Sequence, residues 1–502
     1  MPAEQIAPHR LSRSDMTVIG TLLVASFVVI LNETVMSVAI PVLQKSLGVA
    51  PSVGQWLTTA FMLTMAIVIP LTGYLIQRFG TRTMFIAAMT LFTAGTVLAS
   101  AAPGFEVLLV ARVVQALGTA IMLPLLMTTV MTLVPEDRRG VMMGNISVVI
   151  AVAPALGPTL SGFILDHFGW RTIFYVVAPI AVLALVIGAS VIRDVGERSS
   201  SPMDLASIPL AVLGFGGIVY GLAAIGESVE GDAPVTPWIP LVVGTVALGG
   251  FVTRQIILQR TDSALLDLRV FRSRAFTLSV IVMLTGMATM MGTFIVVPYF
   301  AQTVLELDAF KTGLITLPGG VVMGVASPLI GRIYDLRGPR PLVIPGTILV
   351  AAGAWMLTTV SVDTSIWQLL AANLVLCLGL AATFTPLMTL GLSSVPPQLY
   401  SYGSAVVGTL QQVAGAIGTA LFITVMTVVA TNHREAGVPS AQAIADGVQT
   451  VFIVAGVMGI VLIALGLLVR RPAASDGSVS GPEELDGTDD LDGSADNKVA
   501  VN

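Results

Sequence analysis

Long apolar runs alternate with short polar segments along most of the chain. A helix of about 20 apolar residues is long enough to cross a bilayer. Fourteen such segments can be read from the sequence. They cover residues 16–40, 56–75, 83–102, 107–133, 142–165, 172–192, 205–225, 238–258, 275–300, 312–333, 342–360, 366–392, 404–430 and 448–469. Because helices satisfy their backbone hydrogen bonds internally, the pattern predicts an all-α polytopic membrane protein with fourteen transmembrane helices.

The seventh segment, residues 205–225, is the weakest of the fourteen, because Gly214, Gly216 and Gly217 lower its helix propensity. Losing this helix alone would move every later loop to the other side of the membrane. The first segment is longer than the apolar core of a signal peptide and contains Glu33. We therefore expect it to be a true membrane span.

Basic residues decide the predicted orientation, because cytoplasmic loops of membrane proteins accumulate Lys and Arg. With the N-terminus inside, nineteen of the 24 Lys and Arg residues fall in inner loops or at inner helix ends, and four fall outside. The remaining one, Arg112, lies within a span. The bias predicts a multi-pass protein of the plasma membrane with both termini in the cytoplasm.

The composition excludes several classes of protein. Hydrophobic residues make up 55% of the chain and charged residues 11%, whereas a soluble domain contains about 25% charged residues. This excludes a conventional globular enzyme. The single cysteine, Cys377, excludes an intramolecular disulfide and a multi-cysteine metal site, so we expect no metal and no cofactor. The sequence contains no phosphate-binding loop, which argues against ATP as the direct energy source.

The net charge of -5 arises near the C-terminus, where residues 472–502 contain eight acidic residues and one Lys. The rest of the chain is nearly neutral, so no basic excess indicates a nucleic-acid partner. The composition of this tail, rich in Gly, Ser and Asp, is typical of a disordered segment. This composition is compatible both with an inert tail and with a regulatory or partner-binding tail.

Only two charged residues lie deep inside the predicted spans, Glu33 and Arg112. A charge at the bilayer centre costs about 2.5 to 3.5 kcal/mol, so each one indicates a function. Glu33 precedes Pro41 by eight residues, and Arg112 follows Phe105 by seven. At the rise of a helix these spacings correspond to roughly 12 Å and 10 Å from the outer helix ends. The two depths fit a single cavity.

Glu33 is the candidate proton-carrying carboxylate. Burial favours the protonated form of a carboxylic acid and a bound cation favours the ionised form, which is the competition that an exchanger needs. The alternative is a permanent structural ion pair with Arg112. Gln115 and Thr119 follow Arg112 on one helix face. Together with Asn32, they are candidate residues of a substrate cavity.

Two further spans carry small or polar residues that suit either transport or packing. The fifth span contains prolines and glycines that predict a bent helix in close contact with a neighbour. These residues are Pro154, Gly157, Pro158 and Gly162. In the thirteenth span, Gln411 and Gln412 are candidate cavity residues. Close helix packing, through neighbouring glycines, is the alternative interpretation of that region.

One loop motif occurs twice: residues 73–82 read GYLIQRFGTR, and residues 331–340 read GRIYDLRGPR. The motif residues are Gly73, Gln77, Arg78, Gly80 and Arg82 in the first copy and Gly331, Asp335, Gly338 and Arg340 in the second. The offset maps the first six spans onto the last six. Duplicated six-helix halves are typical of transporters that expose a central site to each side in turn. The alternative is that Gly and Arg are simply common in short inner loops.

The motif has the composition of a latch between helices. Glycines allow close approach, and arginines can bond C-terminal helix carbonyls and carboxylates. Asp335 can supply a carboxylate in the second copy, whereas Gln77 cannot ionise. We therefore expect the first latch to be the weaker one.

These motifs are similar to those of the major facilitator superfamily, whose loop signature reads G-x-L-x-D-R-x-G-R-R. Four more stretches resemble the fourteen-helix drug:proton antiporters of the EmrB/QacA type. They are residues 31–41 (LNETVMSVAIP), 109–118 (LVARVVQALG), 153–162 (APALGPTLSG) and 169–174 (GWRTIF). The resemblance covers residues 16–469. It implies two six-helix halves plus two extra central helices, export of hydrophobic or cationic drugs in exchange for protons, and a sealing role for residues 153–162.

Three positions depart from the pattern of that family. The aspartate of the first span is replaced by Asn32, and the acid has moved to Glu33, about 100 degrees around the helix. The loop aspartate is replaced by Gln77. Two glycines of the fifth-span motif are replaced by Ala153 and Ser161.

The sequence thus predicts five segments. They are an N-terminal cytoplasmic tail (1–15), a six-helix half (16–192), two inserted helices with a cytoplasmic connection (193–274), a second six-helix half (275–469) and the acidic tail (470–502). In the connection, residues 256–274 form either an amphipathic segment on the lipid surface or a plain loop. We expect a monomer whose partners are a small-molecule substrate, protons and membrane lipid. Alternative functions are an exporter dedicated to a single metabolite, lipid or antibiotic, a proton symporter, and a membrane receptor or scaffold.

Overall fold

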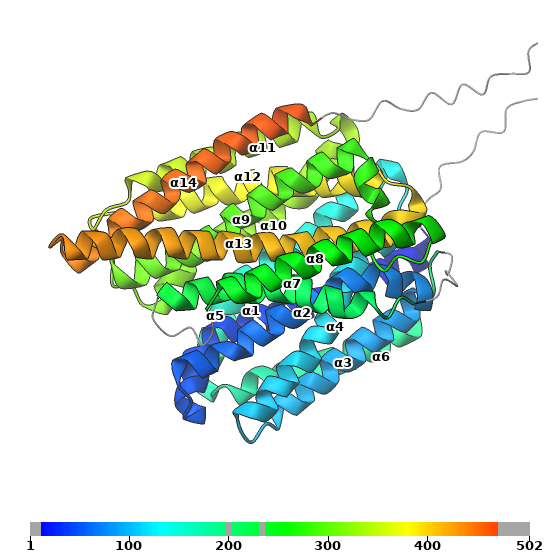
Figure 1. Cartoon of the computed structure of the whole chain (residues 1–502), viewed down its shortest axis with the longest axis horizontal. Coiled ribbons are helices and arrows are strands. Elements are labelled where there is room, and N and C mark those ends of the chain that lie inside the picture. Colours follow the sequence, from blue (N-terminus) through cyan, green and yellow to red (C-terminus); the bar gives the residue numbers. More distant parts are fainter. Residues whose placement is uncertain (1–11, 197–202, 230–235, 470–502) are drawn as a thin grey trace, which may run out of the picture. The chain divides into compact units, whose positions relative to one another are not determined.

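A computed structural model describes residues 12–196, 203–229 and 236–469. Within these ranges all regular secondary structure is helical. Fourteen helices are long and apolar enough to cross a membrane, which confirms the predicted fold class and number of spans. They are α1 (Arg13–Leu47), α2 (Pro51–Phe79), α3 (Thr81–Ser100), α4 (Phe105–Leu133), α5 (Arg139–Phe168), α6 (Arg171–Val191), α7 (Ser207–Val229), α8 (Trp238–Leu258), α9 (Arg274–Thr303), α10 (Ala309–Arg337), α11 (Arg340–Met356), α12 (Ile366–Ser393), α13 (Tyr400–Glu435) and α14 (Ser440–Leu468) (Figure 1). The acidic tail and most of the N-terminal tail lie outside the described residues.

Helix α7 forms where the sequence signal is weakest. A Cβ atom added to Gly217 would lie 2.9 Å from the Cα of Gly244 on α8, and one added to Gly214 would lie 3.0 Å from the backbone nitrogen of Leu248. The glycines that lower helix propensity therefore allow α7 and α8 to pack backbone to backbone. Small residues commonly have this role between helices in membranes.

The ends of α2 and α10 share one geometry, which explains the repeated loop motif. Helix α2 ends at Gly80 with φ of 82°, and α10 ends at Gly338 with φ of 78°. Such positive φ values favour glycine. The N–H of each glycine donates to the carbonyl four residues earlier, of Ile76 and Tyr334. The motif marks a helix end that is followed directly by the next helix.

The first six and last six helices use the same set of contacts. Helix α1 packs on α5, α2 on α4, and α3 on α4 and α6. The matching pairs in the second set are α9 with α13, α10 with α12, and α11 with α12 and α14. The two sets meet along an α5/α10 seam and an α2/α13 seam. Helix α7 packs on both α2 and α13, so the inserted pair adjoins the second seam.

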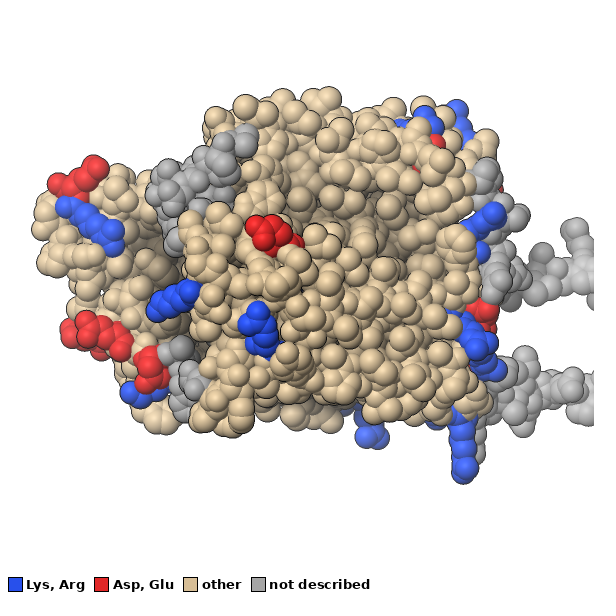
Figure 2. All heavy atoms as spheres, turned by 90° about the horizontal axis from the view of Figure 1, so that it is seen from below, with Lys and Arg blue, Asp and Glu red and all other residues tan. Residues whose placement is uncertain are grey.

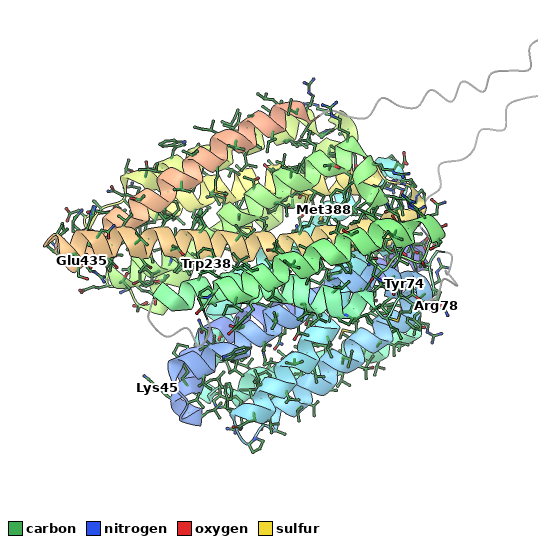
Figure 3. The ribbon with its side chains drawn as sticks, viewed as in Figure 1. Lys45, Tyr74, Arg78, Trp238, Met388 and Glu435 are labelled. Carbon is green, nitrogen blue, oxygen red and sulfur yellow. The ribbon has the colours of Figure 1, made fainter. Side chains whose placement is uncertain are left out.

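The distribution of charge fits a body embedded in a membrane. On the face in Figure 2, a broad belt of mostly uncharged residues lies between two ends where most charged side chains gather. Tyr74 and Arg78 lie toward one end, which we call the loop-motif end (Figure 3). Lys45, Trp238 and Glu435 lie toward the opposite end.

The connection between α8 and α9 corrects one interpretation of the sequence. Leu265, Leu266 and Val270 are buried in the core of the body. The side-chain oxygen of Gln255 on α8 accepts hydrogen bonds from the N–H groups of Leu265 (2.8 Å) and Leu266 (3.2 Å). The lipid-facing interpretation of residues 256–274 is therefore wrong for these apolar side chains, because an amphipathic pattern does not distinguish a bilayer from a protein core.

Candidate functional site

Arg112 lies seven residues after the first residue of α4, Phe105, and is 1% exposed. Its Nη1 donates to Oε1 of Gln115 at 2.9 Å, and its Nε donates to the carbonyl of Leu57 on α2 at 3.4 Å. The guanidinium also lies over the Phe61 ring, 4.0 Å from the ring centroid, in a cation–π contact. Hydrogen bonds and an aromatic face thus stabilise the buried charge.

Gln115 connects Arg112 to a third helix. Its Nε2 donates to Oγ1 of Thr96 on α3 at 2.9 Å, and its backbone carbonyl accepts from the hydroxyl of Thr119. Gln115 and Thr119 are 0% and 4% exposed. The structure places these two residues inside the first six-helix set, where Gln115 orients Arg112.

Glu33 is on α1 and is partly exposed. Among the described residues, no hydrogen bond or ion pair joins Glu33 to Arg112, although the two groups interact electrostatically. The arrangement differs from the structural ion pair considered above, because Arg112 uses other partners.

Asn32 has a different environment from its neighbour. Its side chain is completely buried, and neither its amide nitrogen nor its amide oxygen has a hydrogen-bond partner. Leaving a buried polar group unpaired costs about 1–3 kcal/mol. The move of the acid from position 32 to Glu33 thus places the carboxylate, and not the amide, on the accessible side of α1.

The fifth-span motif packs against the residues of α1 that directly follow Glu33 in the sequence. The Ser161 hydroxyl donates to the carbonyl of Val35 at 2.9 Å, and the Thr34 hydroxyl is 3.4 Å from the carbonyl of Ala153. Gly157 lies against Thr34, so a larger residue there would clash. Two of the residues that differ from the family pattern, Ala153 and Ser161, therefore make α1 contacts of their own.

The other motif residues of α5 pack less closely against neighbouring helices. Pro154 is partly exposed, and a Cβ added to Gly162 would meet nothing within 4 Å. The side chain of Pro158 lies outside the described residues. Close packing within this motif is therefore concentrated at Gly157 and Ser161.

Gln411 and Gln412 on α13 are both partly exposed. The Nε2 atom of Gln412 is 3.7 Å from the sulfur of Met65 on α2, which is a contact across the α2/α13 seam. Of the five predicted cavity residues, the two glutamines are thus accessible, while Asn32, Gln115 and Thr119 are buried.

The second loop motif joins the two six-helix sets. The carboxylate of Asp335 accepts hydrogen bonds from the N–H groups of Gly140 (2.7 Å) and Val141 (3.0 Å) at the start of α5. A carboxylate is stabilised there by unpaired N–H groups and by the helix dipole. Gly331 packs against the backbone of Gly140. Arg340, the last motif residue, is exposed at the start of α11.

The first loop motif joins the two sets by a weaker contact. The Nε2 of Gln77 donates to the backbone carbonyl of Gln398 at 2.5 Å. A Cβ at Gly73 would lie 3.0 Å from the Tyr402 ring. Arg82 remains within its own set, where its Nη2 donates to the carbonyl of Ala189 at the end of α6 at 3.0 Å.

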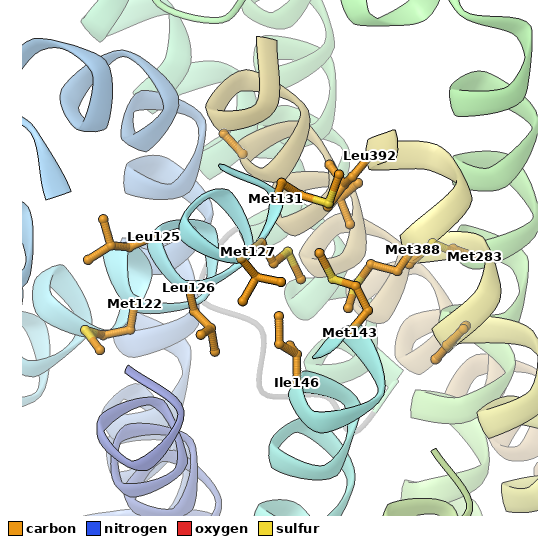
Figure 4. Packing of buried hydrophobic residues seen from close by; sticks show 14 of the residues in the cluster. Met122, Leu125, Leu126, Met127, Met131, Met143, Ile146, Met283, Met388 and Leu392 are labelled. Atoms are coloured by element: carbon orange, nitrogen blue, oxygen red, sulfur yellow. The ribbon is translucent and has the colours of Figure 1, made fainter. Parts of the chain in front are cut away.

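Sequence reasoning missed a cluster of methionines between the two sets. Met127 and Met131 of α4 and Met143 of α5 lie near Met388 of α12 and Met283 of α9 (Figure 4). All five are at most 3% exposed. Methionine is flexible and polarisable, so it fills irregular space between packed helices. The five positions carry no periodic or charge signal that identifies them in advance.

Two hydrogen bonds cross between the sets in the same region. The hydroxyl of Thr385 on α12 donates to that of Ser147 on α5 at 2.8 Å, and the hydroxyl of Thr128 on α4 donates to that of Ser404 on α13 at 3.3 Å. Together with the methionine cluster and the two loop motifs, these contacts join the two sets toward the loop-motif end.

The family model of the Major Facilitator Superfamily matches residues 22–419. The chain belongs to this superfamily. It is 39% identical over 455 residues to an uncharacterized MFS-type transporter, YcnB, of Bacillus subtilis, with 91% of this chain and 95% of the relative covered. Membership confirms the resemblance seen in the motifs and makes the protein a multi-pass membrane transporter of small molecules, not an enzyme.

Two other relatives have names that refer to drugs. The chain is 39% identical over 456 residues to a lincomycin resistance protein, LmrB, of Listeria monocytogenes, covering 90% of this chain and 95% of the relative. It is 29% identical over 431 residues to a multidrug resistance protein B homolog of Mycobacterium tuberculosis, covering 85% of this chain and 79% of the relative.

Solved structures share the fold at low sequence identity. The human organic anion transporter MFSD10 matches with a TM-score of 0.63 at 14% identity, covering 89% of this chain and 99% of that one. The proton:xylose symporter XylE matches with a TM-score of 0.62 at 16% identity, covering 92% and 97%. These likenesses support the major facilitator fold alone.

Proposed function

We propose that the protein is a proton-coupled antiporter that exports hydrophobic or cationic drugs across the plasma membrane. The single observation that carries the proposal is the state of Glu33, a partly exposed carboxylate that has no ion-pair partner among the described residues and lies near the buried Arg112. Such a group can take up a proton or face a cation, but the two compete for one negative charge. The names of the relatives supply the substrate class.

In the proposed cycle, the six-helix halves (16–192 and 275–469) rock about a site near Glu33, and the insertion (193–274) accompanies them. The loop-motif end faces the cytoplasm, as the distribution of basic residues predicts, and both termini lie there. The conformation described is then closed toward the cytoplasm by the Asp335 contact and the methionine cluster. Glu33 takes a proton from outside as the drug leaves, and it releases that proton inside when the next drug binds.

Arg112 has a positioning role in this proposal. Its charge favours the ionised form of Glu33, while its bonds to Gln115 and Leu57 keep it from pairing with the carboxylate directly. Gln411 and Gln412, on the opposite half, are proposed to contact the substrate through their amides. The motif residues Pro154, Gly157, Pro158 and Gly162 are proposed to keep α1 and α5 in close contact so that protons do not leak.

The test of the proposal is the variant Glu33→Gln in inverted membrane vesicles. Tetraphenylphosphonium added to energised vesicles should collapse the pH gradient with the unmodified protein, and Glu33→Gln should abolish this response. Glu106→Gln is the matched control, because Glu106 lies in the first turn of α4, outside the proposed site. A pH response of Glu33→Gln equal to that of the control would overturn the assignment.

The names of the relatives favour a second, narrower candidate, an exporter dedicated to one antibiotic. A panel that contains lincomycin, a lipophilic cation and a neutral hydrophobic drug separates the two functions. A broad exporter protects cells against several of these compounds. Protection against lincomycin alone would show that the protein is a dedicated exporter and not a broad drug exporter.

A further inference from the structure

A cavity of about 240 Å³ lies where α2, α7 and α13 meet. Its lining residues are Gln55, Thr58, Thr59 and Met62 of α2, Val219, Leu222 and Ala223 of α7, and Ala416, Thr419, Ala420 and Ile423 of α13. The α2 residues come from the start of that helix, whereas the loop motif follows its end. The cavity therefore lies toward the end of the body opposite the loop motifs, and each of its three walls comes from a different part of the chain.

The surroundings of the cavity are well packed. The rings of Trp56 on α2 and Tyr220 on α7 lie with their centroids 5.8 Å apart next to the lining residues. Ala66, Val219 and Ala416 form a buried cluster among the same three helices. Packed side chains from all three helices thus border the cavity.

The chemistry of the lining selects a particular kind of ligand. The lining contains no acidic or basic side chain, so a charged ligand would lose its hydration without gaining a counter-charge. It does contain amide and hydroxyl groups on otherwise apolar walls. The hydroxyl oxygen of Thr58 is shielded from solvent and has no hydrogen-bond partner. Sites for drug-sized ligands usually have about 300–1,000 Å³, so this cavity fits a smaller molecule.

We propose that this cavity is a second binding site, separate from Glu33, for a small neutral amphiphile with a hydrogen-bonding group. Because α2 and α13 belong to opposite halves, rocking of the halves changes the distance between two of its walls. An occupant that fits this conformation stabilises it against the others. The ligand therefore slows transport without competing for the central site.

N-phenyl-1-naphthylamine is a suitable probe, since it is uncharged, has one N–H donor and fluoresces in apolar surroundings. Binding is measured on the full chain in lipid nanodiscs, with empty nanodiscs subtracted. Ala223→Phe, which fills the cavity, should remove specific binding. Thr58→Val keeps the side-chain shape but loses the hydroxyl, and it should weaken binding about three- to tenfold, the usual range for one hydrogen bond.

Ala184→Phe is the matched control, because Ala184 lines a different groove, between α1 and α6. It makes the same substitution and should leave binding unchanged. Thermal melting of each variant separates a lost site from a misfolded protein. Equal binding by Ala223→Phe and Thr58→Val relative to the unmodified chain overturns the proposal, and so does an equal loss in Ala184→Phe.

The second site and the proposed proton coupling fail in different ways. Glu33→Gln should bind the probe as the unmodified protein does, even though it no longer exchanges protons. Loss of probe binding in Glu33→Gln would show that the probe binds centrally, which overturns the second site. In the unmodified protein, saturating probe should slow tetraphenylphosphonium-driven collapse of the pH gradient at least twofold, whereas Ala223→Phe should resist this inhibition. An equal rate with and without probe overturns the coupling of the site to transport.

Discussion

The two seams between the halves are related by the internal repeat, yet they are built differently. At the α5/α10 seam, glycines bring the helices into backbone contact, and the Asp335 carboxylate accepts two hydrogen bonds from the start of α5. At the α2/α13 seam, Gly73 lies less tightly against the backbone of Ser401 and Tyr402, the amide of Gln77 donates a single hydrogen bond, and α7 packs on both helices. Bonds to a charged group are about twice as strong as neutral ones. The difference indicates that closure depends mainly on α5/α10, whereas α2/α13 is the seam that accommodates an inserted helix and a cavity.

The largest expected effect comes from separating the α5/α10 seam. A Cβ at Gly331 would meet the backbone of Gly140 and lie 2.9 Å from the nitrogen of Val141, and backbone atoms cannot move aside as a side chain can. Gly331→Ala should therefore lower the free energy of unfolding by about 1–3 kcal/mol, as overpacking does, and strongly reduce transport. Thermal melting and vesicle transport measure both effects.

The control for that variant is Gly249→Ala on α8, where a Cβ would meet nothing within 4 Å. It makes the same change in a helix and should leave melting and transport near those of the unmodified protein. If Gly331→Ala behaves like this control, close contact at the α5/α10 seam is not what holds the halves together.

The next largest effect is expected at the two loop-motif contacts, that of Asp335 and that of Gln77. Asp335→Asn should shift the equilibrium toward opening of the loop-motif end by about 1 kcal/mol, since the single amide oxygen can accept a neutral hydrogen bond from only one of the two N–H groups and the amide nitrogen cannot accept from the other. Gln77→Asp, which restores the residue of the family pattern, should also weaken closure, because a carboxylate cannot donate to the Gln398 carbonyl. Distances between spin labels at the ends of α2 and α13 and of α5 and α10 report both shifts. Tighter closure in Gln77→Asp would mean that the two latches follow one rule.

Several features of the fold and of the candidate site could be predicted from the sequence. Apolar run length predicted the fourteen helices, and spacing predicted the repeated helix ends at Gly80 and Gly338. Charge within spans singled out Glu33 and Arg112. These signals can be recognised in the sequence because unpaired backbone groups and charges are costly within the bilayer in every span.

Other parts of the site could not be predicted, because their partners carry no pattern. Arg112 contacts a backbone carbonyl of Leu57 and the face of Phe61, which are groups that any apolar span offers. The burial of Asn32 beside the accessible Glu33 depends on the rotation of α1 within the bundle. Apolar residues such as Leu265 give the same sequence pattern whether they face lipid or protein, so the pattern does not predict which of the two they contact.

The smallest expected effect concerns the attachment of the inserted helices that cover the α2/α13 seam. The carboxylate of Asp204, just before α7, accepts two hydrogen bonds of 2.7 Å from Arg254 on α8. These bonds, with smaller help from Ser207, lower the pKa of Asp204 to about 2. A lowered pKa means that the stabilisation is complete above about pH 4 and is lost as the pH falls toward 2. Arg254 is 41% exposed, so solvent screens this ion pair and keeps its contribution to stability small. Asp204→Asn should melt earlier than the unmodified protein at pH 6, and the difference should shrink as the pH is lowered to 2.5. A difference that stays constant over this range would show that the ion pair does not hold α7 and α8 over the seam.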